Sequence, residues 1–477
     1  MLLSTLLALA PLALAKFEGG VPQSFINTAI ARTIELGGST HVVTTQYNVK
    51  ALVDNPETYV LALGKEGDEP PAWYEVLVAG QPVQDVVTDN VEGAPAALVP
   101  IGKMKKDGTV TISLNEIVAK SSRPVPAEIE QRAPQYIMWE TNSTLVDSVY
   151  TSDVERIKIR APTPEIIGQG KVPKTYTRDS DLTKSGATIT LGPFYSVPPT
   201  LGKDAKGEQS PFWVHYETKV PIAGIRSLRR SAEVSHWGAN LNIQDEIELF
   251  NNGPRLKGQF SRLNHQQSRF WASKPAQVLS ELVMRLPPLA RSVYYYDVIG
   301  NVSTSHFREG VARKGRTTES QLEFRPRYPL LGGWNYTFTV GWDSPLSESL
   351  KAEQDGKYVL SVPFLTPLKD VVVDDEELRI ILPEGATDVQ VYTPFPVDEI
   401  DHAVHKTYLD TTGRPVVTLK KHLVTENHAQ PVYVTYNYSR AALFKKPLTV
   451  AAFCGSILLL FILLRRVDYS IEKKKRE

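Results

Sequence analysis

The sequence predicts a mainly β protein, with two tandem β-sandwich-like domains followed by a single C-terminal transmembrane helix. Three observations support this fold class. Short β-rich runs, several of them alternating apolar and polar residues, recur along the chain and are bounded by Gly, Pro or Asp, as in sandwiches. A stretch without charged residues lies at residues 448–464. The chain that precedes it is longer than one hydrophobic core usually covers, so we expect more than one domain.

Residues 1–15, MLLSTLLALAPLALA, form an apolar run that ends in Ala13-Leu14-Ala15. This small-x-small ending is typical of a signal peptidase site, although the run lacks Lys or Arg near its start. We therefore expect a signal peptide at 1–15 and Lys16 as the first mature residue.

The first domain is expected at residues 16–226. Residues 41–53 alternate between a face that carries Val43 and Tyr47 and a polar face that carries Gln46, which predicts a half-buried strand. Further short β-rich runs lie at residues 58–63, 73–78, 109–114 and 212–216. Helix is expected to be minor, at residues 25–34 and near 145–157.

The second domain is expected at residues 227–440. Leu241, Ile243, Ile247 and Leu249 alternate before the turn signal at 251–254, NNGP. Later β-rich runs lie at residues 293–302, 324–342, 358–364, 378–382, 389–392 and 432–438.

A short internal similarity also connects the two expected domains. Residues 32–36, RTIEL, resemble 230–234, RSAEV, at an offset of 198, and each segment leads into an alternating strand. Chance similarity and two related domains both remain open.

The uncharged stretch at 448–464 is expected to cross a membrane. Seventeen residues at about 1.5 Å rise span roughly 25 Å, which suits the thinner bilayer of the endoplasmic reticulum. Basic residues are more frequent after the stretch than before it, which places the C-terminus in the cytosol and the bulk of the chain in the lumen. A buried core helix is the alternative interpretation.

Residues 465–477 are expected to be a short basic cytosolic tail. Lys474 and Lys475 resemble the dilysine signal that retrieves type I membrane proteins to the endoplasmic reticulum. An ordinary stop-transfer flank is the alternative.

Composition limits the classes of partner and chemistry. The 53 basic and 53 acidic residues balance, so no direct binding to nucleic acid is expected. Cys454 is the only cysteine and lies in the apolar stretch, which leaves the lumenal part without a disulfide or thiolate site.

A search for catalytic and metal-binding motifs finds none of the common ones for zinc proteolysis, esterase chemistry or nucleotide binding. Residues 374–377, DDEE, are interpreted as a solvated turn, and His402 and His405 as two loop histidines. We therefore assign no catalytic residue, no metal and no cofactor. Tyr294, Tyr295 and Tyr296 are expected to place one ring on the opposite face from the other two, with core packing favoured over a peptide- or sugar-binding platform.

Four Asn-x-Ser/Thr sequons are candidate glycan sites in a lumenal chain. They begin at Asn142, Asn301, Asn335 and Asn437. Asn142 and Asn335 are the better candidates because Thr occupies the third position, whereas Asn437 lies close to the expected membrane.

Four ordered blocks resemble the ribophorin I family: residues 235–238 (SHWG), 256–262 (LKGQFSR), 294–306 (YYYDVIGNVSTSH) and 324–334 (FRPRYPLLGGW). The resemblance implies a non-catalytic subunit of the oligosaccharyltransferase. That complex moves a preassembled glycan from dolichyl diphosphate to Asn of Asn-x-Ser/Thr in nascent proteins. The implied partners are the other subunits, including a multispanning catalytic subunit, together with nascent polypeptides and the membrane of the endoplasmic reticulum.

Animal members of the family carry a sizeable cytosolic domain after the membrane span, so residues 465–477 would allow at most weak, salt-sensitive contact with ribosomes. The alternative function is a stand-alone lumenal β-sandwich module that binds unfolded chains or glycans.

Overall fold

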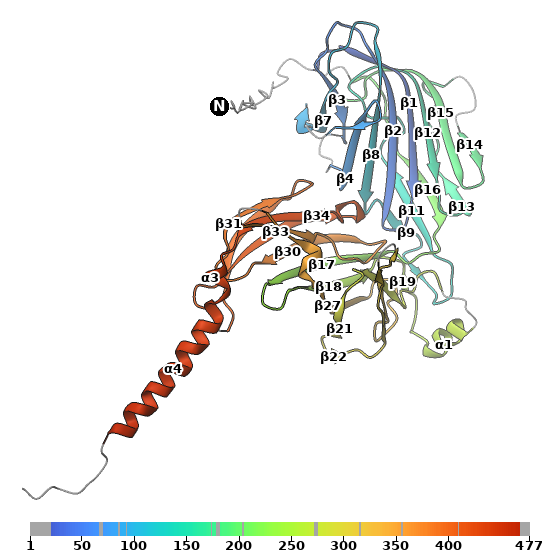
Figure 1. The fold of residues 1–477 in the computed structure, drawn as a ribbon. Helices are drawn as coiled ribbons and strands as arrows, with labels where there is room; N and C mark the ends of the chain where they lie inside the picture. Colours follow the sequence, from blue (N-terminus) through green and yellow to red (C-terminus); the bar gives the residue numbers. More distant parts are fainter. Residues whose placement is uncertain are drawn as a thin grey trace, which may run out of the picture. The chain divides into compact units, whose positions relative to one another are not determined.

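The computed structural model describes residues 21–467, with short gaps at 66–69, 84–85, 92, 173, 178–181, 203–204, 271–274, 314–315, 354–355 and 409. The expected signal peptide and the expected retrieval residues Lys474 and Lys475 lie outside the described residues. The described chain is mainly β, as the sequence predicts, and forms two compact units (Figure 1). The first unit holds residues 21–127 and 134–220, and the second holds 128–133 and 221–467.

The first unit contains one eight-stranded sheet, one four-stranded sheet and one three-stranded sheet. The eight-stranded sheet has the order β14-β15-β12-β1-β2-β8-β4-β5. Its strands are β1 (Phe25–Leu36), β2 (Thr40–Ala51), β4 (Trp73–Val78), β5 (Gln81–Pro82), β8 (Thr109–Ala119), β12 (Ser152–Arg160), β14 (Leu182–Ser185) and β15 (Thr188–Val197). The smaller sheets contain β3 (Thr58–Ala62), β6 (Val87–Val91) and β7 (Ala94–Pro100), and β9 (Ser122–Pro124), β11 (Tyr136–Thr141), β13 (Ile166–Gln169) and β16 (Phe212–Glu217).

The second unit repeats this arrangement, with an eight-stranded sheet in the order β32-β33-β30-β17-β18-β27-β21-β22. Its strands are β17 (Ala223–Ser235), β18 (Asn240–Asn251), β21 (Arg291–Asp297), β22 (Gly300–Asn301), β27 (Asn335–Pro345), β30 (Val372–Ile381), β32 (Glu399–His405) and β33 (Arg414–Val424). The smaller sheets contain β20 (Leu282–Leu286), β23 (Ser305–Arg308) and β26 (Ser320–Phe324), and β28 (Leu350–Ala352), β29 (Lys357–Pro363), β31 (Thr387–Tyr392) and β34 (Pro431–Asn437). Two short pairs join β10 (Glu128–Ile129) to β19 (Arg255–Leu256) and β24 (Ala312–Arg313) to β25 (Arg316–Thr317).

The two large sheets match strand for strand, both in spatial order and in chain order. The central pairs β1–β12 and β17–β30 are parallel, whereas their other neighbours pair antiparallel. The β-bulge in the β1–β2 pair falls at Thr28, and the bulge in the β17–β18 pair falls at Arg226, again 198 residues later. This shared register favours the interpretation of the residue 32–36 and 230–234 similarity as two related domains.

Aromatic clusters fill the core between the sheets of each unit. In the first unit the ring of Tyr59 lies 5.4 Å from that of Phe25 and 4.8 Å from that of Tyr150. In the second unit the ring of Phe324 lies 4.7 Å from Tyr295 and 5.4 Å from Phe338. Because Tyr295 faces this core, it opposes Tyr294 and Tyr296, whose rings stack at 6.0 Å on the other face.

Each unit also buries a glutamate on the strand that pairs parallel with the first strand of its eight-stranded sheet. Glu155 on β12 lies opposite Ile30, and Glu376 on β30 lies opposite Leu228, which is 198 residues after Ile30. The two glutamates are 0% and 2% exposed. Burial raises the pKa of Glu155 to about 7 and raises that of Glu376 well above its usual range. In both units burial therefore favours the neutral form of the glutamate.

Several local expectations from the sequence are wrong. Residues 25–34 form β1 rather than a helix, and the second expected helix overlaps β12. Residues 374–377 lie within β30 rather than in a turn, so their side chains alternate between the two faces of the sheet. His402 and His405 lie on the edge strand β32 rather than in a loop.

The expected division between residues 226 and 227 falls inside β17, whereas the two compact units divide between Val220 and Pro221. The described helices are α1 (Arg262–Phe270), α2 (Leu346–Ser349), the 3-10 turn η1 (Glu426–His428), α3 (Arg440–Leu443) and α4 (Lys445–Arg466).

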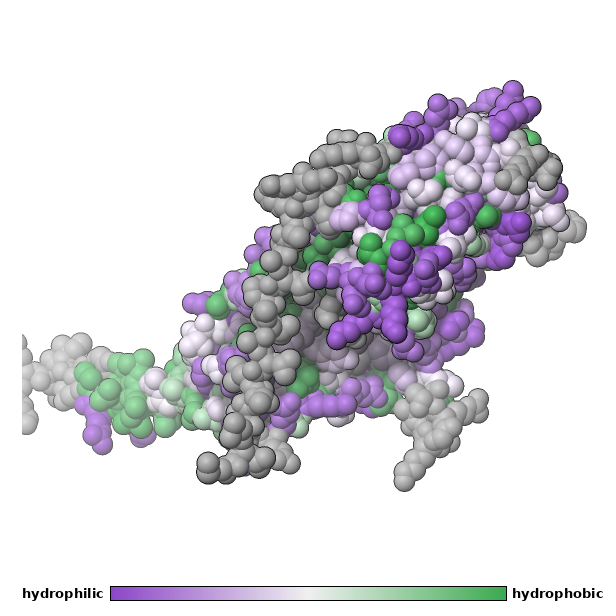
Figure 2. Space-filling model, turned by 90° about the horizontal axis from the view of Figure 1, so that it is seen from above, coloured by the Kyte–Doolittle hydropathy of each residue, from purple (hydrophilic) through white to green (hydrophobic). Residues whose placement is uncertain are grey.

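Helix α4 includes the apolar stretch predicted at 448–464 and starts three residues earlier. It is long and apolar enough to cross a membrane, and none of its residues is buried against the rest of the chain. Its apolar surface is visible as the green segment at the left of Figure 2. Polar side chains within the helix bond to its own backbone, as where Ser456 Oγ donates to the carbonyl of Ala452 at 2.7 Å. This pairing suits a medium without water.

Candidate functional site: the junction of the second domain and α4

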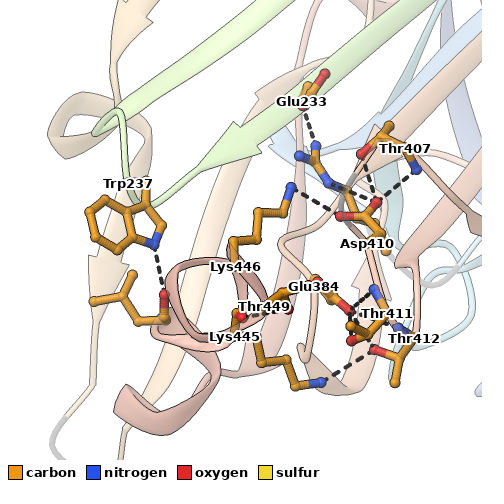
Figure 3. Close-up of polar contacts among 12 residues, drawn as sticks. Glu233, Trp237, Glu384, Thr407, Asp410, Thr411, Thr412, Lys445, Lys446 and Thr449 are labelled. Carbon is orange, nitrogen blue, oxygen red and sulfur yellow. Dashed lines mark hydrogen bonds and ion pairs between the residues drawn. The ribbon is translucent and has the colours of Figure 1, made fainter. Parts of the chain in front are cut away.

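A network of charged and hydroxyl side chains, which we call the clasp, connects the second domain to the start of α4 (Figure 3). Its carboxylates are Glu233 at the end of β17, Glu384 after β30, and Asp410 before β33. Its cations are Arg414, Lys445 and Lys446, and its hydroxyl groups belong to Thr407, Thr411 and Thr412.

Glu384 organises one half of the clasp. Its Oε1 accepts bonds of 2.8 and 2.7 Å from the backbone N–H groups of Thr411 and Thr412, and bonds of 2.6 and 3.0 Å from their hydroxyls. Burial alone would raise the pKa of Glu384, but these hydrogen bonds outweigh it and lower the pKa to about 2. The ionised carboxylate therefore fixes the loop that precedes β33.

Asp410 organises the other half. Its carboxylate accepts bonds of 2.8 and 2.7 Å from the N–H and hydroxyl of Thr407, and lies 3.0 Å from Lys446 Nζ and 3.6 Å from Arg414 Nε. Burial opposes ionisation, yet the bonds from Thr407 and Lys446 lower the pKa of Asp410 to about 2. Arg414 also pairs with Glu233, so one chain of charges runs from β17 to the first turn of α4.

Two further contacts attach α3 to the domain, beside the bond from Lys445 that belongs to the clasp. Trp237 Nε1 donates to the carbonyl of Leu443 at 2.7 Å, and Lys445 Nζ donates to Thr412 Oγ1 at 3.3 Å. Gly385 has a φ of +91°, and a Cβ there would lie 2.9 Å from the Cβ of Ala442. The close approach of the loop to α3 therefore requires glycine.

The described part of the clasp stabilises the contact between the second domain and α4. Its ionised groups are engaged with one another or with the neighbouring threonines. Burial lowers the pKa of neighbouring His236, whose Nε2 bonds to the hydroxyl of Tyr436 at 2.9 Å. Within the described ranges, no three His, Cys, Asp or Glu side chains gather as metal ligands do. The arrangement can set the angle and stiffness of the connection between the domain and the helix.

All four sequon asparagines are exposed in the structure. Asn142 follows β11, Asn301 ends β22, Asn335 begins β27 and Asn437 ends β34. The sequons are dispersed, and the described contacts do not bring any of them into the clasp. Exposure is compatible with a glycan at each asparagine, and occupancy remains a prediction.

Sequence reasoning missed the clasp. Its residues come from four separate segments between 233 and 446, and no spacing rule connects them. The local signal that could have pointed to it is the cluster of threonines around Asp410, because hydroxyl groups beside a carboxylate often satisfy a buried acceptor.

The fold and junction define a class of protein: two β-sandwiches of the same topology carried on one candidate membrane helix. Sequence comparison identifies the family. The model of the family described as Ribophorin I matches residues 25–465, and the chain belongs to this family.

Relatives with curated names support the assignment. The chain is 30% identical over 446 residues to "Dolichyl-diphosphooligosaccharide--protein glycosyltransferase subunit 1" of Caenorhabditis elegans, covering 93% of this chain and 72% of the relative. It is 32% identical over 375 residues to subunit 1B of Oryza sativa subsp. japonica, covering 78% and 73%. It is also 32% identical over 370 residues to subunit 1A of Arabidopsis thaliana, covering 78% and 56%.

Among solved structures, native yeast LTA4 hydrolase matches 44% of this chain and 31% of its own at 11% identity and a TM-score of 0.26. A similarity this low does not bear on function.

Proposed function

We propose that this chain is a non-catalytic subunit of the oligosaccharyltransferase, the complex that transfers a preassembled oligosaccharide from dolichyl diphosphate to Asn of Asn-x-Ser/Thr. The observation that carries the proposal is the family match across residues 25–465, which includes both sandwiches and nearly all of α4. The names of the relatives give the complex and the subunit position.

Within that complex we assign the chain a structural role. The clasp joins the second sandwich to the membrane helix through paired, ionised groups rather than through a flexible linker. A domain attached in this way keeps a defined height and angle above the bilayer, which a subunit needs if it is to position neighbours or an acceptor polypeptide. The glycosyl transfer carried out by the complex would come from a multispanning catalytic partner.

We further propose that the chain resides in the membrane of the endoplasmic reticulum with both sandwiches in the lumen. The basic residues after the apolar stretch and the four exposed sequons support this orientation. Lys474 and Lys475 would then act as a retrieval signal on the cytosolic side.

Co-purification tests the proposal. Native membranes are solubilised in mild detergent, the tagged chain is isolated, and its partners are identified by mass spectrometry. We expect the catalytic subunit in an amount comparable to the tagged chain. Recovery of the chain as a free monomer would favour the stand-alone lumenal module instead.

A further inference from the structure

A hollow of about 560 Å³ lies beside the clasp, between the second domain and the first turns of α4. On the α4 side its wall is formed by Lys446, Pro447, Val450 and Ala451. On the domain side it is formed by strand ends and loops, with residues Val234, Ser235, His236, Trp237, Pro383, Glu384, Arg414 and Tyr438, and α3 contributes Ala442 and Leu443.

Most polar groups of this wall are already engaged, although Oε2 of Glu384 is buried without a hydrogen-bond partner among the described residues. Glu384, Arg414 and Lys446 belong to the clasp, Trp237 Nε1 bonds to the Leu443 carbonyl, and His236 bonds to Tyr436 while its ring stacks at 4.5 Å on Tyr438. What remains for an occupant is mainly the apolar surface of Val450, Ala451, Leu443 and the aromatic rings. An occupant that brings its own unpaired polar groups would find few partners.

The position of the hollow identifies the surrounding medium. Its α4 wall begins with Lys446 and continues into the uncharged part of the helix, so in the proposed membrane orientation it lies where the helix enters the bilayer. Trp237, which is 60% exposed, stands at the same junction, and tryptophan is enriched at this depth of membranes. In that orientation the apolar wall is continuous with the hydrocarbon of the bilayer.

We infer that the hollow binds one acyl chain of a bilayer glycerophospholipid, wedged between the second domain and α4. The end of a partner helix fits less well, because it brings up to four unpaired backbone groups to a wall in which one oxygen of Glu384 is the main described polar group left without a hydrogen bond. An acyl chain brings none, and its volume fills the space that would otherwise leave apolar surface without contacts. The lipid adds a third connection between domain and anchor, beside the clasp and α3.

Two adjacent alanines provide a matched pair of variants for the test. Ala451 lines the hollow, and Ala452 does not. The complete chain is expressed in membranes that contain phosphatidylcholine with a photoactivatable diazirine in one acyl chain. After irradiation, the labelled peptides are mapped by mass spectrometry. We expect label on the peptides that carry residues 234–237 and 442–451, reduced at least fivefold by Ala451→Trp and changed less than twofold by Ala452→Trp.

A second measurement covers the case in which Ala451→Trp disturbs folding. A diazirine analogue of leucine at position 443 of the otherwise unchanged chain should crosslink to lipid. A crosslink to another protein at that position, or equal labelling of the two alanine variants, would overturn the inference. Neither result depends on whether the chain assembles with a glycosyltransferase, so failure here and failure of the proposed function remain distinguishable.

Discussion

Glu155 carries a buried carboxyl group whose pKa is raised to about 7 by burial in the first sandwich. In the unfolded chain a glutamate titrates near 4.3, so between about pH 4.5 and 7 the folded state holds a proton that the unfolded state releases. The free energy of unfolding therefore decreases as pH rises through this window, by at most about 1.4 kcal/mol per unit. Below the window both states are protonated and the slope from this group disappears.

Glu155→Gln removes this titration while keeping the neutral shape of the protonated acid. We expect the unfolding midpoint of the variant to depend less steeply on pH between 5 and 7 than that of the unchanged protein. Thermal unfolding in detergent at several pH values measures it. Parallel pH profiles for the two proteins would show that Glu155 is ionised in the folded chain.

The side chain of Asp410 is 0% exposed. Its carboxylate pairs with Lys446 and Arg414 and accepts a hydrogen bond from Thr407. Asp410→Asn leaves two cations facing a neutral amide, so we expect a loss of about 2 kcal/mol in stability and a looser connection to α4. Asp401→Asn is the matched control, because Asp401 is 49% exposed and pairs with Lys420 on the surface at 3.2 Å. Its effect should stay below about 0.5 kcal/mol. Equal shifts in the unfolding midpoint for Asp410→Asn and Asp401→Asn would contradict a stabilising role of the clasp.

Asn142 and Asn335 are exposed and precede threonine in the third position. We expect glycans on both when the chain is made in its own secretory pathway, and lower occupancy at Asn437, which lies just before α3 and, in the proposed orientation, close to the membrane. Peptide mapping with and without an endoglycosidase measures each site. Unmodified Asn142 and Asn335 in that mapping would argue against a lumenal location.

At the scale of the element, β1 shows where sequence reasoning fails. Ile26, Ile30 and Ile34 recur every four residues, which imitates one face of a helix. The bulge at Thr28 interrupts the two-residue alternation, so Phe25 and Asn27 are buried before it and Ile30 and Ile34 after it. By contrast, β2 alternates without interruption and could be predicted from the sequence.

Helix α4 offers a second test at the scale of the element. Gly455 and Ser456 are adjacent small residues on α4, and a Cβ at Gly455 would meet no atom within 4 Å. A partner helix could therefore approach closely along this face. Replacing both with Leu should leave folding of the sandwiches unchanged while weakening assembly in mild detergent. Complexes of unchanged composition would show that this face contacts lipid.

At the scale of the whole molecule, the mainly β class and the candidate membrane helix could be predicted from local patterns. The relation between the two domains stayed one of two alternatives, because the similarity of residues 32–36 to 230–234 covers five residues, whereas the structure repeats strand order, parallel pairing and bulge position. The clasp could not be predicted from the sequence, because Glu233 and Lys446 are connected through Arg414 and Asp410 only after the second domain has folded.

The central claim is that this chain serves protein N-glycosylation as a subunit without its own chemistry. Depletion of the chain in living cells, followed by measurement of sequon occupancy across secreted glycoproteins, tests it most directly. We predict reduced occupancy at many sequons, restored by the unchanged chain and restored only partly by Asp410→Asn. Full occupancy after depletion, with the catalytic subunit still assembled and active, would contradict the account.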